Sequence, residues 1–129
     1  MDYAPQTSLN PAVKVRFDVA SRVTQQAYRE ALRLKAAASR RVRELLGEDG
    51  VLVLPTMPGI APPLASSERE FEFFRSQALP MLCISGHSGC PQISLPMATV
   101  ENCPLGLSLM APPGSDRALI ALARRILDE

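Results

Sequence analysis

Apolar residues recur at every third or fourth position over two long stretches of the chain, which is the spacing of amphipathic helices. The longer stretch runs from about Arg22 to Leu46, and Gly47 provides its natural end. A shorter helix is predicted from about Pro11 to Ala20, because Asn10 is a good capping residue and proline suits a first helical turn.

Two further helices are predicted by their starting residues. Ser67 and Glu70 have the spacing of a capping box, in which the serine and glutamate side chains satisfy free backbone amides at a helix start. Ser115 is predicted to cap a last helix. The inward positions would be Phe71, Phe74, Ala78 and Leu82 in the former and Leu119, Leu122 and Ile126 in the latter.

Three short apolar runs predict strands, and each is closed by proline. The run GVLVLPT ends at Pro55 and is typical of a strand buried on both faces, as in a parallel sheet. QISLP is expected to end at Pro96 and LGLSLMA at Pro112. The predicted order ααβαββα, with four helices and three strands, indicates an α/β fold with helices on a small mixed sheet, forming a single unit over residues 1–129.

Composition adds little about partners and something about location. The 129 residues, 47% of them hydrophobic, are enough for one core, and a net charge of +1 gives no reason to expect nucleic acid. The first residues have no basic and apolar segments of a secretory leader, and the 3 cysteines are an odd number without a disulfide framework. We therefore predict reduced thiols and a cytoplasmic protein.

The stretch SGHSGCPQ, residues 85–92, contains the only histidine and has the appearance of a catalytic loop. A hydrolase nucleophile turn, however, has the pattern Gly-x-Ser-x-Gly between a strand and a helix. Here Cys90 occupies the fifth position, and a helix precedes the turn instead of following it. A tight helix-to-strand turn is therefore favoured over a nucleophilic Ser88, and His87 is interpreted as a helix-end residue that hydrogen-bonds a carbonyl.

Zinc binding is the alternative chemistry for this region, because Cys83, His87, Cys90 and Cys103 offer thiolate and imidazole ligands. No Cys-x-x-Cys pair is present, and isolated cysteines usually pack as small hydrophobes. We predict no metal site and leave open whether these side chains ever bind metal.

The long predicted helix is basic, with seven Arg or Lys side chains and two Glu side chains between residues 22 and 46. Tyr28 is its only aromatic residue, and the sequence has no glycine-rich phosphate loop. A solvated helix face is therefore favoured, and we expect neither a nucleic acid nor a membrane as partner.

Three stretches resemble, in order, the C-terminal part of the amidase signature enzymes. DGVLVLPTMPGIAPPL is similar to a P-T-x-P…A-P loop, FRSQALPMLCISGHSGCPQISLPM to a G-x-P-x-x-S-x-P turn, and NCPLGLSLMAPPGSDRALIALA to a P-x-G-x-x-L strand with a D…L…A helix. Details at 74–76, 88–92 and 114–116 are similar to plant-type indole-3-acetamide hydrolases and their non-catalytic relatives in the chloroplast import machinery.

The resemblance implies an amide hydrolase that converts a carboxamide to a carboxylate and ammonia. It places the Ser, cis-Ser and Lys triad of these enzymes in a glycine- and serine-rich N-terminal half, and the only lysines here, Lys14 and Lys35, have no such cluster nearby. The chain is thus expected to be a C-terminal fragment, with no catalytic residue, no cofactor and no activity alone. The resemblance implies channel-lining roles for Thr56, Met57, Met81, Ile84, Ser85 and Ser88.

The buried strand VLVL requires cover on both faces, which three strands and four helices hardly supply. The expected partner is the missing N-terminal amidase half, or a second copy bound through exposed sheet surface. A free-standing, non-catalytic interaction or scaffold module derived from the same fold is the alternative. The substrate and the oligomeric state stay open at this point.

Overall fold

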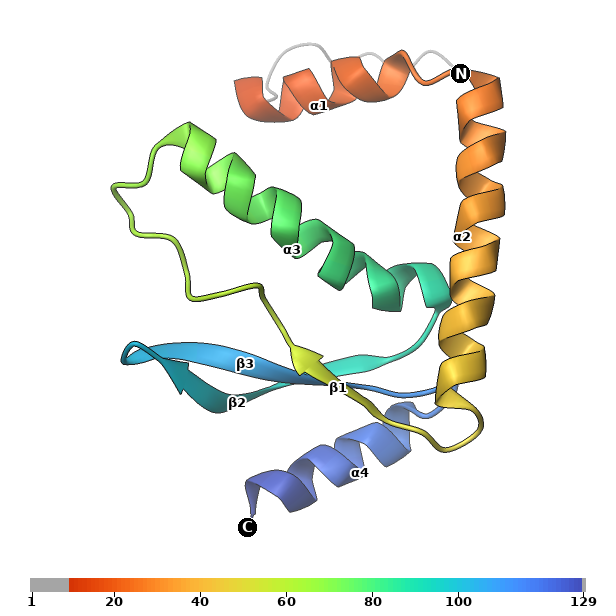
Figure 1. Ribbon diagram of the computed structural model, residues 1–129, viewed down its shortest axis with the longest axis vertical. Helices are drawn as coiled ribbons and strands as arrows, with labels where there is room; N and C mark the ends of the chain where they lie inside the picture. The colour runs from red at the N-terminus through yellow and green to blue at the C-terminus, as the bar shows by residue number, and fades with distance from the viewer. Residues whose placement is uncertain (1–9, 129) are drawn as a thin grey trace. The chain divides into compact units, whose positions relative to one another are not determined.

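The structure is a computed structural model that describes residues 10–128. Residues 1–9, on which the prediction of no secretory leader rests, lie outside the described residues. The chain divides between Leu34 and Lys35 into two compact units, and the predicted single unit over 1–129 stays a prediction. The predicted order ααβαββα is confirmed: α1 (Pro11–Ser21), α2 (Gln25–Leu46), β1 (Leu52–Pro55), α3 (Glu68–Ser88), β2 (Gln92–Val100), β3 (Cys103–Met110) and α4 (Asp116–Leu127) (Figure 1).

The first unit holds α1 and the beginning of α2. Thr24 Oγ1 accepts the backbone N–H of Ala27 at 3.2 Å, which is the contact of a helix cap. The helix therefore begins at Gln25, later than the predicted start near Arg22. Val13 and Phe17 of α1 are both exposed.

The second unit is built on a three-stranded sheet with the strand order β1-β3-β2. Both pairs are antiparallel, with Val53 opposite Leu109 in one and Ile93 opposite Leu109 in the other. The sheet formed by the described residues is therefore antiparallel rather than mixed. The prediction that β1 is buried on both faces is also wrong, because β1 is an edge strand whose burial alternates and Val53 is 55% exposed.

The strand β2 passes Pro96 and ends at Val100, contrary to the predicted end at Pro96. A register shift between Leu95 and Ala98 explains the difference, because an irregularity on an edge strand tolerates a residue without a backbone N–H. Glu101 and Asn102 follow with φ values of 50° and 60°, as two-residue hairpin turns require. The strands β2 and β3 thus form one hairpin.

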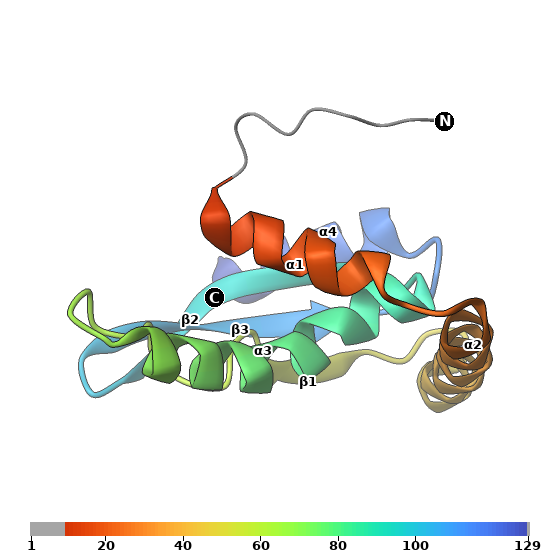
Figure 2. The ribbon, with the colours of Figure 1, turned by 90° about the horizontal axis from the view of Figure 1, so that it is seen from above.

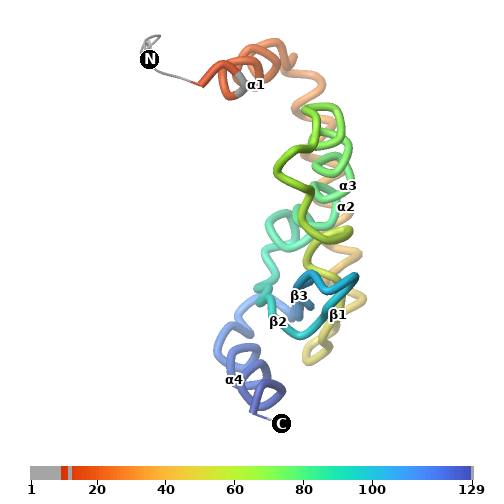
Figure 3. The backbone as a smooth tube through the Cα atoms, turned by 90° about the vertical axis from the view of Figure 1, so that its left-hand side faces the viewer, coloured from red at the N-terminus to blue at the C-terminus, as the bar shows by residue number. Residues whose placement is uncertain are grey.

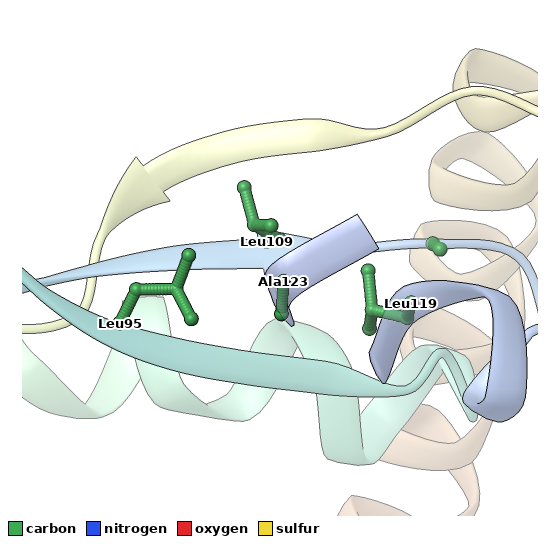
Figure 4. Packing of buried hydrophobic residues seen from close by; sticks show 5 residues of the cluster. Leu95, Leu109, Leu119 and Ala123 are labelled. Carbon is green, nitrogen blue, oxygen red and sulfur yellow. The ribbon is translucent and has the colours of Figure 1, made fainter. Parts of the chain in front are cut away.

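Helix α4 packs on one face of this hairpin and forms the larger core. Leu119 and Ala123 of α4 contact Leu95 and Leu109 of the strands, together with Ala111 (Figure 4). Leu122 and Ile126 pack against the same cluster, so the predicted inward face of α4 is confirmed. Ser115 stands at the N-cap, but its hydroxyl donates to Pro112 O at 2.6 Å and accepts no hydrogen bond from the helix start.

Helix α3 lies on the other side of the sheet and extends along the strands (Figures 2 and 3). Its predicted capping box is present: Glu70 N–H donates to Ser67 Oγ, and Ser67 N–H donates to Glu70 Oε2. The C-terminal end is fixed by Gly89, whose φ of 70° is readily adopted only by glycine. A second, smaller core on this side contains Leu46, Cys90 and Met110.

Candidate functional site

Three hydroxyl groups meet on the α3 side of the sheet. Thr56 follows β1 and continues its ladder, because its N–H donates to Gly106 O at 2.8 Å. Thr56 Oγ1 lies 2.6 Å from Ser94 Oγ of β2 and 2.8 Å from Ser108 Oγ of β3. Gln92 Nε2 donates to Ser108 Oγ at 2.9 Å. The four linked side chains are called here the hydroxyl row.

Strand alternation explains why these side chains share a face. Residues two apart along a strand point to the same side, and Ser94 pairs with Ser108 in the antiparallel register. Ile93, Leu95, Leu107 and Leu109 occupy the alternate positions and point to the α4 side. The fold therefore separates an apolar face from a polar one within the same two strands.

Gly106 leaves the space in which Thr56 and Ser94 of the hydroxyl row contact each other. A Cβ atom placed on Gly106 would lie 2.6 Å from Thr56 Oγ1 and would also collide with Ser94 Oγ. Any side chain at this position would therefore separate the two hydroxyl groups. Gly106 does not have a positive φ. The lack of space for a Cβ atom, and not the backbone conformation, therefore explains why glycine stands at this position.

The hydroxyl row forms part of a cleft of about 370 Å³, called here the hydroxyl cleft. None of its lining residues has an ionisable side chain, so the cleft offers hydrogen bonds and apolar surface but no acid or base of its own. The lining residues are Thr56, Met57, Gly59, Ala61, Pro62, Phe71, Phe74, Ser94, Pro104, Leu105 and Gly106.

The six residues expected to line a channel do not meet in one cavity. Thr56 and Met57 line the hydroxyl cleft. Ile84 and Ser88 line a separate pocket of about 340 Å³ between α3 and the C-terminal half of α2, while Met81 and Ser85 line neither cavity. A channel-lining role for the six residues stays a prediction.

The turn at residues 85–92 is held by backbone interactions. Ser88 is 1% exposed, and its Oγ lies 2.7 Å from Ile84 O and 3.2 Å from Ser85 O, so its proton is directed to the helix backbone. Ser85 Oγ donates to Cys90 O at 2.8 Å. Both hydroxyl groups therefore stabilise the helix end, in agreement with the interpretation of a tight turn.

Helix α2 supplies partners for the last carbonyls of α3. Ser39 Oγ donates to His87 O at 2.6 Å, and the Arg43 guanidinium donates to Ser88 O at 2.9 Å from Nε and 2.6 Å from Nη2. The hydrogen bond of His87 is thus made by its backbone carbonyl, whereas a bond from the side chain to a carbonyl was predicted. These contacts satisfy carbonyls that a helix end leaves unpaired.

The cysteines are free thiols in the described residues: Cys83, Cys90 and Cys103. Within residues 10–128, no three His, Cys, Asp or Glu side chains gather closely enough to hold a metal ion. Cys90 is buried in the smaller core next to Met110, as a small hydrophobe would be.

The sequence-based reasoning missed Gln92, Ser94, Gly106 and Ser108. Their signal is the alternation in Gln92-Ile93-Ser94-Leu95 and Gly106-Leu107-Ser108-Leu109, where polar or small residues share every second position. Both stretches were interpreted as strands, but the polar positions were not aligned with each other. The antiparallel register that brings them together is a tertiary feature.

Comparison with known proteins identifies the family. The sequence model described as Amidase matches residues 1–120. The chain belongs to the amidase family. It is 38% identical over 112 residues to Amidase 1 of Arabidopsis thaliana, covering 87% of this chain and 26% of that protein. The predicted resemblance to the amidase signature enzymes and their plant-type branch is therefore confirmed.

Two further similarities concern location and fold. Outer envelope protein 64, chloroplastic, of Arabidopsis thaliana is 38% identical over 79 residues, which cover 61% of this chain and 13% of that protein. Its name contradicts the predicted cytoplasmic location. A crystal structure of an amidase superposes with a TM-score of 0.67 at 26% identity, covering 89% of this chain and 27% of that one. This amidase confirms the predicted α/β amidase fold.

The chain spans about a quarter of the length of Amidase 1, at 26%, and a similar share of the amidase crystal structure, at 27%. Among the described residues, no helix is long and apolar enough to cross a membrane.

Proposed function

We propose that this chain contributes one wall of the substrate site in an amide hydrolase and supplies no catalytic group itself. The observation that carries the proposal is the hydroxyl cleft, where Thr56 and Ser94 border an apolar cavity without an ionisable side chain. Such a surface can bind and orient a carboxamide, but it cannot activate a nucleophile. The Ser, cis-Ser and Lys groups would come from another part of an amidase fold.

Exposed apolar surface in the second unit supports a partner that completes the fold. Val53 on the edge strand β1 is 55% exposed and Phe73 on α3 is 65% exposed. An edge strand also has unpaired backbone groups on its outer side. We therefore infer that the partner is the remaining part of an amidase, with self-association through the same surface as the competing outcome.

Complementation tests this function directly. Amidase 1 of Arabidopsis thaliana is truncated before the segment that aligns with this chain and is produced alone or together with the 129-residue chain. We expect neither piece alone to release ammonia from arylacetamides, and the pair to do so. The readout is ammonia release per mole of purified complex.

A matched pair of variants shows whether the hydroxyl cleft participates. Thr56→Val removes a hydroxyl group from the cleft while nearly preserving side-chain volume, and we expect it to lower the activity of the pair about threefold. Thr99→Val makes the same change at an exposed position of β2 and should have no effect. Hydrolysis by the chain alone, or equal activity of both variants, would contradict the proposal.

A non-catalytic interaction module is the second candidate function. The similarity to Outer envelope protein 64, chloroplastic, favours it, and this candidate would act at the outer envelope of an organelle. Co-sedimentation of the chain with chloroplast outer-envelope vesicles, combined with failure of complementation, would favour the module. Recovered activity without co-sedimentation would favour the hydrolase.

A further inference from the structure

The donor in each bond of the hydroxyl row can be assigned, because a hydroxyl group has one donor and two acceptor positions. Ser108 is 0% exposed, and it accepts a hydrogen bond from Gln92 Nε2 at 2.9 Å. Its own proton has one other partner among the described residues, Thr56 Oγ1 at 2.8 Å. Since an unmade buried donor is costly, Ser108 donates to Thr56.

The direction of the next bond follows. Thr56 Oγ1 accepts from Ser108, so the proton of Thr56 is directed to its remaining partner, Ser94 Oγ at 2.6 Å. Ser94 accepts this bond with one lone pair and keeps its own proton and its second lone pair. Within residues 10–128, Ser94 Oγ has no second partner, and Ser94 is exposed at the border of the hydroxyl cleft.

The chain of bonds therefore runs from Gln92 through Ser108 and Thr56 to Ser94. Each donor in such a row polarises the next, which makes Ser94 a stronger donor and its second lone pair a weaker acceptor. The apolar part of the cleft lies beside this donor and includes Phe71 and Phe74. An aromatic or other flat apolar group can pack there while a polar group bonds to Ser94.

We propose that the hydroxyl cleft selects ligands with a compact apolar body and a hydrogen-bond acceptor, such as a carbonyl oxygen, and that Gln92 sets this preference. The inference rests on the proposed function in treating the cleft as a ligand site. Its test uses the 129-residue chain alone and requires no hydrolysis, so the two proposals can fail independently.

Two probes of similar size separate donor from acceptor. Acetophenone has a carbonyl group that only accepts, and indole has an N–H group that only donates. Dissociation constants are measured by NMR titration of the ¹⁵N-labelled chain, following the amides of Leu105, Gly106 and Phe74. We expect acetophenone to bind about fivefold more tightly than indole, because the polarised Ser94 proton makes the stronger hydrogen bond.

Variants assign the preference to named side chains. Ser94→Ala should abolish the fivefold preference, and Phe71→Ala should weaken both probes equally. Gln92→Glu should reverse the preference, because a carboxylate only accepts: Ser108 would then donate to it, Thr56 to Ser108 and Ser94 to Thr56. Ser94 would then offer only lone pairs to the cleft, and indole would bind more tightly.

The amide spectrum of each variant is compared with that of the unmodified chain to verify the fold. If Gln92→Glu does not fold, Thr56→Val serves instead, since it removes the bond that polarises Ser94 and should reduce the preference to about twofold. Equal binding of the two probes by the unmodified chain, or a preference that survives Ser94→Ala, would overturn the proposal. Binding that Phe71→Ala leaves unchanged would overturn it as well.

Discussion

The two faces of the sheet in the second unit are made by the same strands but have different chemistry. On the α4 face, Leu95 and Leu109 pack against Leu119 and Ala123 with no polar side chain in the cluster. On the α3 face, the alternate positions of the same two strands carry Ser94 and Ser108, and the hydroxyl row ends at the hydroxyl cleft. The α4 face is closed by packing, whereas the α3 face is accessible at the end of the row that contains Ser94.

This difference shows how a small segment separates stability from recognition. Burial of the α4 face scales with apolar area, which each leucine supplies in full. The hydroxyl row buries little apolar area, and its hydrogen bonds add only modestly to stability while fixing the direction of each donor. We therefore expect substitutions on the α4 face to affect folding and those at the cleft to affect binding.

Leu109→Ala should have the largest effect on stability. Leu109 is 3% exposed in the main core, and truncating a buried leucine leaves a cavity that costs about 3 kcal/mol. Urea unfolding followed by circular dichroism measures the loss. Leu127→Ala, at an exposed position of α4, is the control, and comparable losses in both variants would show that the α4 face is not the main core.

Ser108→Ala should have an intermediate effect of about 1.5 kcal/mol. The change removes the acceptor of Gln92 Nε2 and the donor to Thr56 Oγ1, and both of these groups are partly buried. Ser94→Ala removes the same group at the exposed end of the row and should cost less than about 0.5 kcal/mol. Equal losses from the two serines in urea unfolding would contradict the asymmetry of the row.

Arg43→Ala removes a contact between α2 and the C-terminal end of α3, and it should lower the free energy of unfolding by about 1 kcal/mol. The guanidinium makes two hydrogen bonds to Ser88 O, but its exposure reduces their net value. Arg41→Ala is the matched control on the same helix, because its contact with Glu44 is a solvated ion pair at 3.9 Å. An equally large loss of stability in Arg41→Ala would show that a change in helix propensity, and not the lost contact with α3, causes the effect.

The start of α3 should show the smallest effect, and it depends on pH. The pKa of Glu70 is held below its usual value mainly by the hydrogen bond from the Ser67 hydroxyl, and secondly by the bond from the Ser67 backbone N–H. Because the folded-state pKa is lowered, the stabilisation is present above the unfolded pKa and is lost as the pH falls through the folded value. Helicity should therefore decrease in acid more in the unmodified chain than in Glu70→Gln, whereas Glu48→Gln should behave like the unmodified chain.

The order of elements could be predicted from the sequence because its signals are local. The Ser67 and Glu70 capping box, the end of α2 at Gly47 and the inward face of α4 depend on neighbouring residues. The error at Pro96 has the opposite cause. A proline ends a central strand but is tolerated on an edge strand, and strand order is not encoded locally.

The candidate site was predictable only in part. Thr56 and Met57 are among the residues for which the family resemblance implies a channel-lining role, and both line the hydroxyl cleft. Ser94 and Ser108 required the strand register, since the sequence shows only that each falls on an alternating position. The direction of the hydrogen bonds required burial as well, because only a fully buried Ser108 is forced to donate to Thr56.

Ser94→Ala is the variant that tests the division between the two faces most directly. The account predicts that it leaves the urea midpoint of the chain unchanged while lowering the activity of the complemented amidase about fivefold, because it removes one donor to the ligand and no buried group. Full activity in the complemented enzyme, or a fall in the urea midpoint as large as that of Leu109→Ala, would contradict it.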